Sequence, residues 1–137
     1  MFLPQERSVS ILKRRLAIEI IAFGFKHGIP TDLELLFDVR FLRNPNYEPE
    51  LEPLTGLDPA VAAYVAADPS AEPFLKRLFD LVDFLVPLYA EDRQDLKIGV
   101  GCTGGRHRSV YIAHRLCTHL EASDEVRVRL ETRDTAK

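Results

Sequence analysis

The sequence predicts an α/β domain built on a mostly parallel sheet flanked by helices. Short segments rich in β-branched and aromatic residues alternate with longer segments of helix-forming residues, the order typical of strand-helix-strand units. A glycine-rich turn connects one of these strands to the helix after it, as in phosphate-binding loops. With 137 residues, of which 46% are hydrophobic, the chain is long enough to bury one such core, so we expect a single domain over residues 1–137.

Four strands are expected. Residues 16–25 and 35–42 are rich in β-branched and aromatic side chains and are followed by turns that contain glycine or proline. Residues 96–101 are a short apolar run that ends in glycine, and residues 126–132 form the last strand. The strand-helix-strand order in the second half of the chain is that of a right-handed crossover unit, which predicts parallel pairing.

Three helices are expected between and after these strands. The first covers residues 60–67, with Asp58 as its cap and Pro59 at its first helical position. The second, residues 72–89, carries apolar side chains on more than one face, which predicts that it is deeply packed. The third, residues 108–121, follows the glycine-rich turn directly.

The glycine-rich turn, residues 98–109, has the chemistry of an anion-binding site. Backbone N–H groups converge at such a strand-to-helix turn, and its glycines allow the backbone to approach a ligand closely. Arg108 adds a planar guanidinium that can hold two oxygens of one phosphoryl group. His107 either donates a hydrogen bond to the phosphate or packs the turn. The residues of this turn that we expect to bind the ligand are Cys102, Thr103, Gly104, Gly105, His107, Arg108 and Ser109.

A second group of polar residues is expected on the other side of the ligand. Ligands of open parallel sheets bind beyond the carboxyl ends of the strands. If the second and third strands are neighbours, Asp38, Arg40 and Asn44 approach the same crevice as the turn. Residues 44–57 form a long irregular loop, a type that often builds binding sites. We therefore expect Arg40, Asn44 and Asn46 to bind the remainder of the ligand.

The same turn has the spacing C-x-x-G-x-x-R-S, which resembles the phosphate loop of cysteine-dependent phosphatases. A thiol at a helix N-terminus near Arg and His has a lowered pKa and can attack phosphorus, so Cys102 is a candidate nucleophile. Such phosphatases usually carry His before the Cys, where this chain has Gly101, and they need a general acid from another loop. The alternative is that Cys102 is a small apolar residue packed beneath an anion-binding turn.

Four motifs in order resemble the C-terminal domain of the RapZ family. They are AFGFKHGIP at residues 22–30, LFDVRFLRNP at 36–45, LTGLD at 54–58 and GCTGGRHRSVY at 101–111, within a match over about residues 16–122. The resemblance implies a domain that binds an amino-sugar phosphate such as glucosamine 6-phosphate. It also implies contact with a small regulatory RNA, as an adaptor for a ribonuclease, and assembly into a homo-oligomer.

Several chemistries are not expected. Full-length RapZ proteins carry an N-terminal nucleotide-binding domain with a G-x-x-x-x-G-K-[ST] loop, and nothing in this chain matches that pattern, so we expect neither such a domain nor ATP or GTP hydrolysis. Metal binding is not expected, because His114, Cys117 and His119 are not accompanied by a C-x-x-C or H-x-x-x-H pattern. No other cofactor is expected.

The charge pattern limits any RNA site to a local patch. The formal net charge of the chain is −3, so it has no overall positive field of the kind that nucleic-acid-binding domains show. Basic residues gather near both ends, and they form one patch if the ends meet in the fold; the alternative is solvated charge at strand ends. Arg106, in the turn, is expected to point to solvent or to a nucleic acid. The candidate RNA-binding residues are Lys13, Arg14, Arg15, Arg106, Arg127 and Arg129.

The sequence also predicts a soluble, cytoplasmic protein. No apolar run approaches the roughly 20 residues that a membrane-spanning helix needs, and charged residues are scattered through the N-terminal segment. Cys102 and Cys117 do not make a disulfide framework, and a reducing compartment suits an exposed thiol in the turn. Cys117 is expected to be a buried helix residue.

Overall fold

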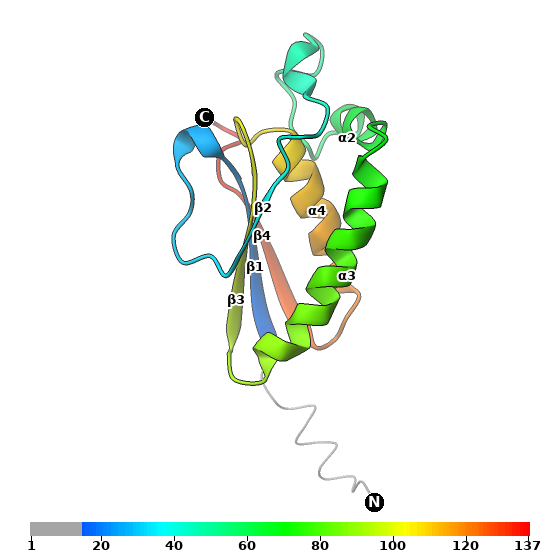
Figure 1. Cartoon of the computed structure of the whole chain (residues 1–137). Coiled ribbons are helices and arrows are strands. Elements are labelled where there is room, and N and C mark those ends of the chain that lie inside the picture. Colours follow the sequence, from blue (N-terminus) through cyan, green and yellow to red (C-terminus); the bar gives the residue numbers. More distant parts are fainter. Residues whose placement is uncertain (1–14) are drawn as a thin grey trace, which may run out of the picture.

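The computed structural model describes residues 15–137 and contains a four-stranded parallel sheet (Figure 1). The strands are β1 (Leu16–Gly24), β2 (Leu35–Asp38), β3 (Asp95–Cys102) and β4 (Val126–Thr132). Their order across the sheet is β2-β3-β1-β4, so the first strand of the chain lies inside the sheet between β3 and β4. The predicted α/β class, with its parallel sheet, is confirmed.

The helices lie on one side of this sheet (Figure 1). Helix α4 (Arg108–Glu121) packs against β1, β3 and β4, and α3 (Ala71–Ala90) and the short α2 (Pro59–Ala66) pack against α4. Alternate side chains of the two central strands point toward the helices, because successive residues of a strand face opposite sides. The buried core on this side includes Leu16, Ile18, Ile20, Ala22, Leu96, Ile98 and Val100.

The opposite face of the sheet is only partly covered. Over residues 15–137 no α-helix packs on it, and the segment of residues 25–34 crosses its upper part. The side chains of Phe25 and Leu33 lie against Gly101 and Gly99 of β3, where a larger residue would displace them. The lower part of this face is open, which is unusual because parallel sheets are generally covered on both sides.

Two of the predicted elements differ from the structure. Strand β2 ends at Asp38 rather than at residue 42, because the Asp38 carboxylate accepts hydrogen bonds from the backbone N–H and the guanidinium of Arg40, which turns the chain. The deep packing expected of α3 is wrong. Its inner side is buried on α4, whereas Leu81, Phe84 and Leu88 on its outer side are exposed.

The start of α2 also differs in detail. Asp58 is the cap residue and Pro59 is the first helical residue, as predicted. The Asp58 carboxylate, however, accepts the backbone N–H of Thr55 at 2.8 Å and makes no hydrogen bond to the helix. It therefore stabilises the turn that leads into α2. Within residues 15–137, no helix is both long enough and apolar enough to cross a membrane.

Candidate anion-binding site

The turn between β3 and α4 lies at the carboxyl end of the sheet and touches the end of β1. Gly105 has a φ of 81°, in the left-handed region that favours glycine. A Cβ atom on Gly105 would lie 2.4 Å from the backbone nitrogen of Gly24, and one on Gly24 would lie 2.3 Å from the carbonyl carbon of Gly104. The two turns therefore meet backbone to backbone, and glycine is required on both sides of the contact.

A cavity of about 200 Å³ opens beside this contact. It holds most of the predicted ligand-binding residues together, whereas Gly105 and Ser109 are buried behind its wall and Arg40 does not line it. Among the described residues, basic side chains outnumber acidic ones in the lining, where Glu52 is the single acidic side chain. The lining residues are Lys26, His27, Asn44, Asn46, Glu52, Cys102, Thr103, Gly104, Arg106, His107, Arg108 and Lys137.

Arg108 is buried and connects the turn to the segment after β2. Its Nη1 donates to the carbonyl oxygens of Arg40 at 2.7 Å and Leu42 at 3.1 Å, and its Nη2 donates to Thr103 Oγ1 at 3.3 Å. Its Nε is buried and has no hydrogen-bond partner among the described residues. The predicted grip on two phosphoryl oxygens stays a prediction, although the Nη1 group already donates to two backbone carbonyls.

His107 packs the loop that forms another wall of the cavity. Its Nε2 lies 3.0 Å from the carbonyl oxygen of Glu52, and this nitrogen must carry the proton because a carbonyl only accepts. Burial lowers the pKa of His107 below its ordinary value. The backbone of Leu51, Glu52 and Leu54 acts in the opposite direction and raises the pKa, but the effect of burial is larger. Of the two roles expected for His107, the structure shows the packing role, with the ring still at the cavity surface.

Cys102 is buried and not an exposed thiol, which corrects the expectation from the sequence. Its Sγ lies 3.2 Å from the Oγ of Ser109, which is itself fully buried in the first turn of α4. Cys117 is buried in α4 as predicted. This burial raises the pKa of its thiol, and the nearby Glu121 carboxylate raises it further. Neither cysteine forms a disulfide.

Arg40, Asn44 and Asn46 are placed differently from one another. Arg40 lies on the surface, where its guanidinium bonds the Asp38 carboxylate and stacks 4.0 Å from the Phe25 ring centroid. This hydrogen-bonded ion pair holds the pKa of Asp38 below its usual range. Asn44 and Asn46 line the cavity, and the Asn44 side-chain oxygen accepts the backbone N–H of Asn46 at 3.0 Å. Two of these three predicted residues are therefore brought to the site.

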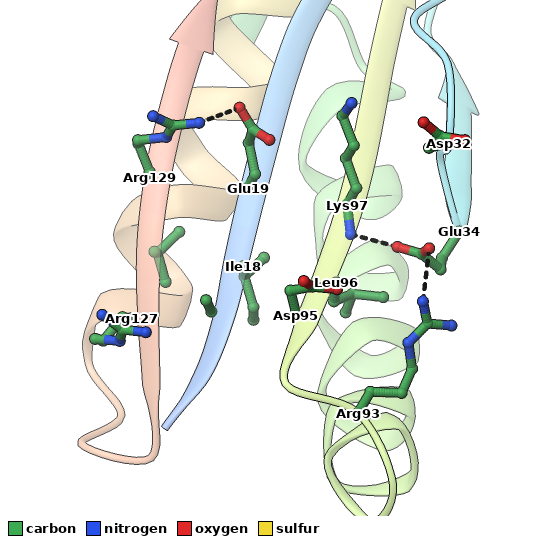
Figure 2. A pocket seen from close by; sticks show the side chains of 12 residues that line it. Ile18, Glu19, Asp32, Glu34, Arg93, Asp95, Leu96, Lys97, Arg127 and Arg129 are labelled. Carbon is green, nitrogen blue, oxygen red and sulfur yellow. Dashed lines mark hydrogen bonds and ion pairs between the residues drawn. The ribbon is translucent and has the colours of Figure 1, made fainter. Parts of the chain in front are cut away.

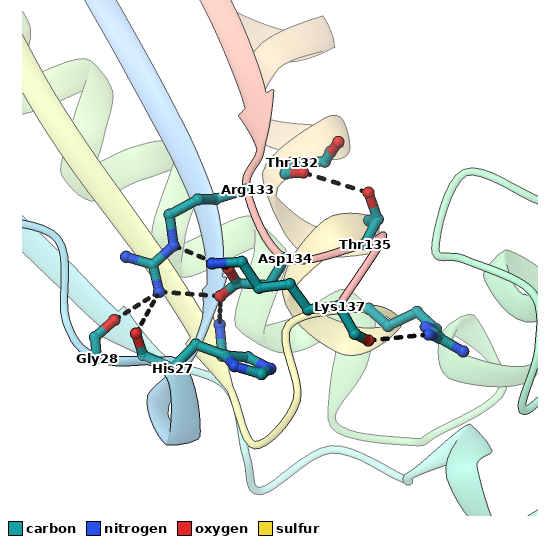
Figure 3. Close-up of polar contacts among 9 residues, drawn as sticks. His27, Gly28, Thr132, Arg133, Asp134, Thr135 and Lys137 are labelled. Atoms are coloured by element: carbon teal, nitrogen blue, oxygen red, sulfur yellow. Dashed lines mark hydrogen bonds and ion pairs between the residues drawn. The ribbon is translucent and has the colours of Figure 1, made fainter.

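The C-terminal segment is held against the end of β1 by polar contacts and adds Lys137 to the cavity lining, a feature that the sequence did not reveal (Figure 3). The buried Asp134 carboxylate accepts the backbone N–H of Gly24 at 2.8 Å and pairs with Arg133 and Lys137, each at 2.9 Å. Burial by itself would raise the pKa of Asp134, but these hydrogen bonds outweigh it and hold the pKa well below its usual range. Arg106 adds a hydrogen bond to the Lys137 carbonyl at 3.2 Å, so it does not simply point to solvent.

A comparison with known families agrees with this geometry. A model described as the RapZ C-terminal domain matches residues 16–136, which include every lining residue of the cavity except Lys137. The chain belongs to the RapZ C-terminal domain family. The match extends beyond residues 16–122, where the motifs lie, and includes β4 and Asp134.

Three similar proteins carry the name nucleotide-binding protein. The one from Rubrobacter xylanophilus is 53% identical over 118 residues, which cover 85% of this chain and 39% of that protein. The one from Rhodospirillum rubrum is 57% identical over 106 residues, which cover 77% of this chain and 33% of that protein. The one from Nitratidesulfovibrio vulgaris is 53% identical over 112 residues, which cover 81% of this chain and 38% of that protein. This RapZ C-terminal domain chain thus spans well under half the length of these relatives.

The candidate RNA-binding residues of this RapZ-family chain lie at two ends of the sheet. Lys13 and Arg14 fall outside the described residues, and Arg106 lies at the cavity. Arg15 is exposed just before β1, which pairs with the strand that carries Arg127 and Arg129. The N-terminal ends of β1 and β4 lie next to each other, as a shared basic patch requires. Arg106, however, lies at the carboxyl end of the sheet, away from this patch.

The surroundings of Arg127 and Arg129 are electrically mixed (Figure 2). They line an open hollow of about 680 Å³ on the uncovered face of the sheet. Arg129 pairs with Glu19, and Glu34 accepts hydrogen bonds from Arg93 and from the backbone of Lys97. The hollow contains as many acidic as basic side chains, so RNA contact stays a prediction. Its charged residues are Glu19, Asp32, Glu34, Asp95, Arg93, Lys97, Arg127 and Arg129.

The histidines of α4 are not arranged as metal ligands. His119 Nε2 lies 2.9 Å from the carboxylate of Asp83 on α3, and its ring stacks on Phe79 at 4.2 Å between centroids. Among residues 15–137, no three His, Cys, Asp or Glu side chains converge on one point. His119 therefore joins α3 to α4.

Proposed function

We propose that this domain binds a phosphorylated amino sugar, represented by glucosamine 6-phosphate, in the cavity between the glycine-rich turn and residues 44–52. The observation that carries the proposal is the buried Arg108 Nε, which has no acceptor among the described residues and belongs to a side chain that lines the cavity. An unsatisfied buried donor costs about 1–3 kcal/mol, and a phosphate oxygen would satisfy it.

The phosphate end of the ligand fits the wall formed by the turn. Thr103 and Gly104 lie next to the N-terminus of α4, where the helix dipole favours an anion. Lys26 adds positive charge from another segment of the chain, whereas the ammonium group of Lys137 is paired with Asp134. Lys26, Arg106 and Arg108, from two separate segments, therefore bring positive charge to one small cavity in which Glu52 is the single acidic side chain among the described residues, a distribution that favours a phosphomonoester.

Isothermal titration calorimetry with glucosamine 6-phosphate tests the proposal, with inorganic phosphate as the reference ligand. The Arg108→Ala change should weaken sugar-phosphate binding by about 10- to 100-fold, because it removes charge-assisted hydrogen bonds worth about 1.5–3 kcal/mol. The matched control is Arg127→Ala, which removes an arginine at the far end of the sheet and should leave affinity unchanged.

Because Arg108 also bonds the carbonyls of Arg40 and Leu42, the variant must be checked by thermal unfolding. Lys26→Ala provides a second test, since the Lys26 side chain is exposed and lines the cavity. A folded Arg108→Ala protein with parental affinity, or a parent chain that binds neither ligand, would exclude the proposal.

Glu52 is placed to distinguish an amino sugar from a neutral one. It is the only carboxylate of the cavity lining, and its contact with Arg106 is long, at 3.5 Å. We expect Glu52→Gln to reduce the preference for glucosamine 6-phosphate over glucose 6-phosphate by about fivefold, the effect of one partly exposed ion pair. Competition titration of the two sugars measures the ratio.

The Glu52→Gln change tests the side chain alone, because the loop is held by hydrogen bonds to the backbone carbonyl of this residue. Its carbonyl accepts from His107 and Arg106, and a side-chain substitution leaves that carbonyl in place. Glu50→Gln, two residues away and outside the cavity lining, is the control. An unchanged ratio in Glu52→Gln would mean that the amine is recognised elsewhere or not at all.

A cysteine-dependent phosphatase is the alternative, and one contact favours it. The Oγ of Ser109, 3.2 Å from Cys102 Sγ, can donate a hydrogen bond to a thiolate. The thiolate would form a bond to phosphorus as the P–O ester bond breaks, with the leaving oxygen protonated by solvent water. A water molecule would then cleave the P–S bond, which releases phosphate and restores the cysteine. Hydrolysis of p-nitrophenyl phosphate that is lost in Cys102→Ser would establish this function, and an inactive parent chain would exclude it.

A further inference from the structure

The short turn after β1 carries two of the residues that line the cavity. It is a three-residue 3₁₀ helix, η1 (Phe25–His27), and both Lys26 and His27 lie at the cavity. None of the residues of η1 is buried, so burial in the core does not by itself fix the position of this turn. Its place depends on the contacts that its backbone makes with neighbouring segments.

Two backbone hydrogen bonds hold one part of η1. The Lys26 N–H donates to the carbonyl oxygen of Thr103 at 3.2 Å, which joins η1 to the glycine-rich turn. The Gly28 N–H donates back to the carbonyl oxygen of Phe25 at 3.1 Å and closes the turn. The carbonyl oxygens of His27 and Gly28 take no part in these bonds and accept from another segment of the chain.

That segment follows β4, and the donor is Arg133 (Figure 3). Its Nη2 lies 2.6 Å from the carbonyl oxygen of Gly28 and 3.3 Å from that of His27. The same guanidinium donates through Nε and Nη2 to the two carboxylate oxygens of Asp134, each at 2.9 Å. The Asp134 carboxylate also accepts the Gly24 N–H, so one arginine–carboxylate pair binds the residues on both sides of η1. A planar guanidinium suits this arrangement, because its donors have fixed directions.

We propose that Arg133 is a positioning residue for ligand binding, which holds η1 so that Lys26 and His27 lie at the cavity. This role rests on the proposed function, because it concerns the same ligand and the same cavity. Arg133 is not one of the residues that line the cavity, so it acts through η1 and does not touch the ligand. Its sequence position, 105 residues from Gly28, gives no sign of this role.

Calorimetric titration of glucosamine 6-phosphate in two backgrounds tests this role. In the parent, Arg133→Gln should weaken binding by about tenfold, because Lys26 and His27 lose their fixed place. In a chain in which both of these residues are alanine, Arg133→Gln should weaken binding by less than about twofold, since η1 then presents no side chain to the ligand. The matched control is Arg115→Gln, which removes an arginine paired with Glu72 outside the cavity lining and should leave affinity unchanged.

Amide hydrogen exchange provides a second readout that needs no ligand. The N–H groups of Lys26 and Gly28 should exchange about tenfold faster in Arg133→Gln than in the parent, because local opening of η1 costs less free energy. Arg133→Lys keeps a positive charge beside Asp134 and guards against a glutamine variant that does not fold. Its single ammonium group replaces the fork, so it should show smaller changes in the same direction.

The outcomes distinguish this role from the proposed function. A parent chain that does not bind the sugar phosphate would overturn both. If the parent binds, parental affinity of folded Arg133→Gln, or of Arg133→Lys where the glutamine variant does not fold, would overturn only the role of Arg133. An equal loss of affinity in the two backgrounds, or unchanged exchange at Lys26 and Gly28, would also show that Arg133 does not act through η1.

Discussion

Replacing Gly105 with alanine is expected to lower the free energy of unfolding by about 3 kcal/mol or more. A non-glycine residue at its φ of 81° costs about 1–2 kcal/mol, and forcing atoms into a filled space costs about 1–3 kcal/mol in addition. The added Cβ would lie 2.4 Å from the Gly24 nitrogen, so the turn and the end of β1 would have to separate. Because the glycine-rich turn carries Thr103, Gly104 and Arg108 of the cavity lining, ligand binding should be weakened as well.

Gly104→Ala is the matched control for this prediction. A Cβ atom on this neighbouring glycine would have no atom within 4 Å, and its φ is not in the left-handed region, so alanine should be tolerated with little change in stability. Urea unfolding of the parent and the two variants measures the difference. Equal stability of Gly105→Ala and Gly104→Ala would show that the backbone contact between the two turns is looser than the structure indicates.

Replacing Asp134 with asparagine is expected to destabilise the domain by about 3 kcal/mol. This value is the low end of the free-energy cost of removing one partner of a buried ion pair. The cost is low because Arg133 and Lys137 are partly exposed and can be hydrated once the Asp134 charge is removed. Asparagine keeps the size of the side chain and an oxygen for the Gly24 N–H, so the change isolates the charge. Urea unfolding at pH 6 measures the effect, with the exposed Asp124→Asn as the control.

The pH dependence of this difference has a definite sign. The pKa of Asp134 in the folded protein lies below its value of about 3.9 in the unfolded chain, so its contribution is complete above pH 4 and declines as the pH falls below that value. At pH 3 the difference between parent and variant should be smaller by about 1 kcal/mol, since one pKa unit corresponds to about 1.4 kcal/mol. A difference that grows in acid would contradict this assignment.

Asp134 also shows why part of the site could not be predicted from the sequence. It lies 110 residues from Gly24 along the chain, and neither residue carries a local pattern that points to the other. The contact exists because β4 pairs with β1 and brings the C-terminal segment over the end of β1. The same applies to Lys137, which belongs to no recognisable motif, and to Glu52, whose place in the cavity depends on the path of an irregular loop.

The residues of the glycine-rich turn are close together in the sequence, which explains why their proximity in the fold could be predicted. Cys102, Thr103, Gly104, His107 and Arg108 are within a few residues of one another, so any strand-turn-helix geometry brings them together. What the spacing did not determine is the direction of the Arg108 donors. Its Nη1 group donates to the carbonyl oxygens of Arg40 and Leu42, which follow β2. These carbonyls are within reach because β2 pairs with β3 and so places the segment after β2 beside the turn.

Local chemistry therefore determined the elements of this protein, its parallel α/β class, its phosphate-type turn and its family. These depend on periodicity and on residues close together in the sequence, which act before distant contacts form. Only the tertiary structure decided that β2 ends early, that Cys102 is buried, that the C-terminal segment packs against the end of β1 and that one side of α3 remains exposed. Each of these depends on which surfaces pack together, and burial is a property of the whole fold rather than of any segment.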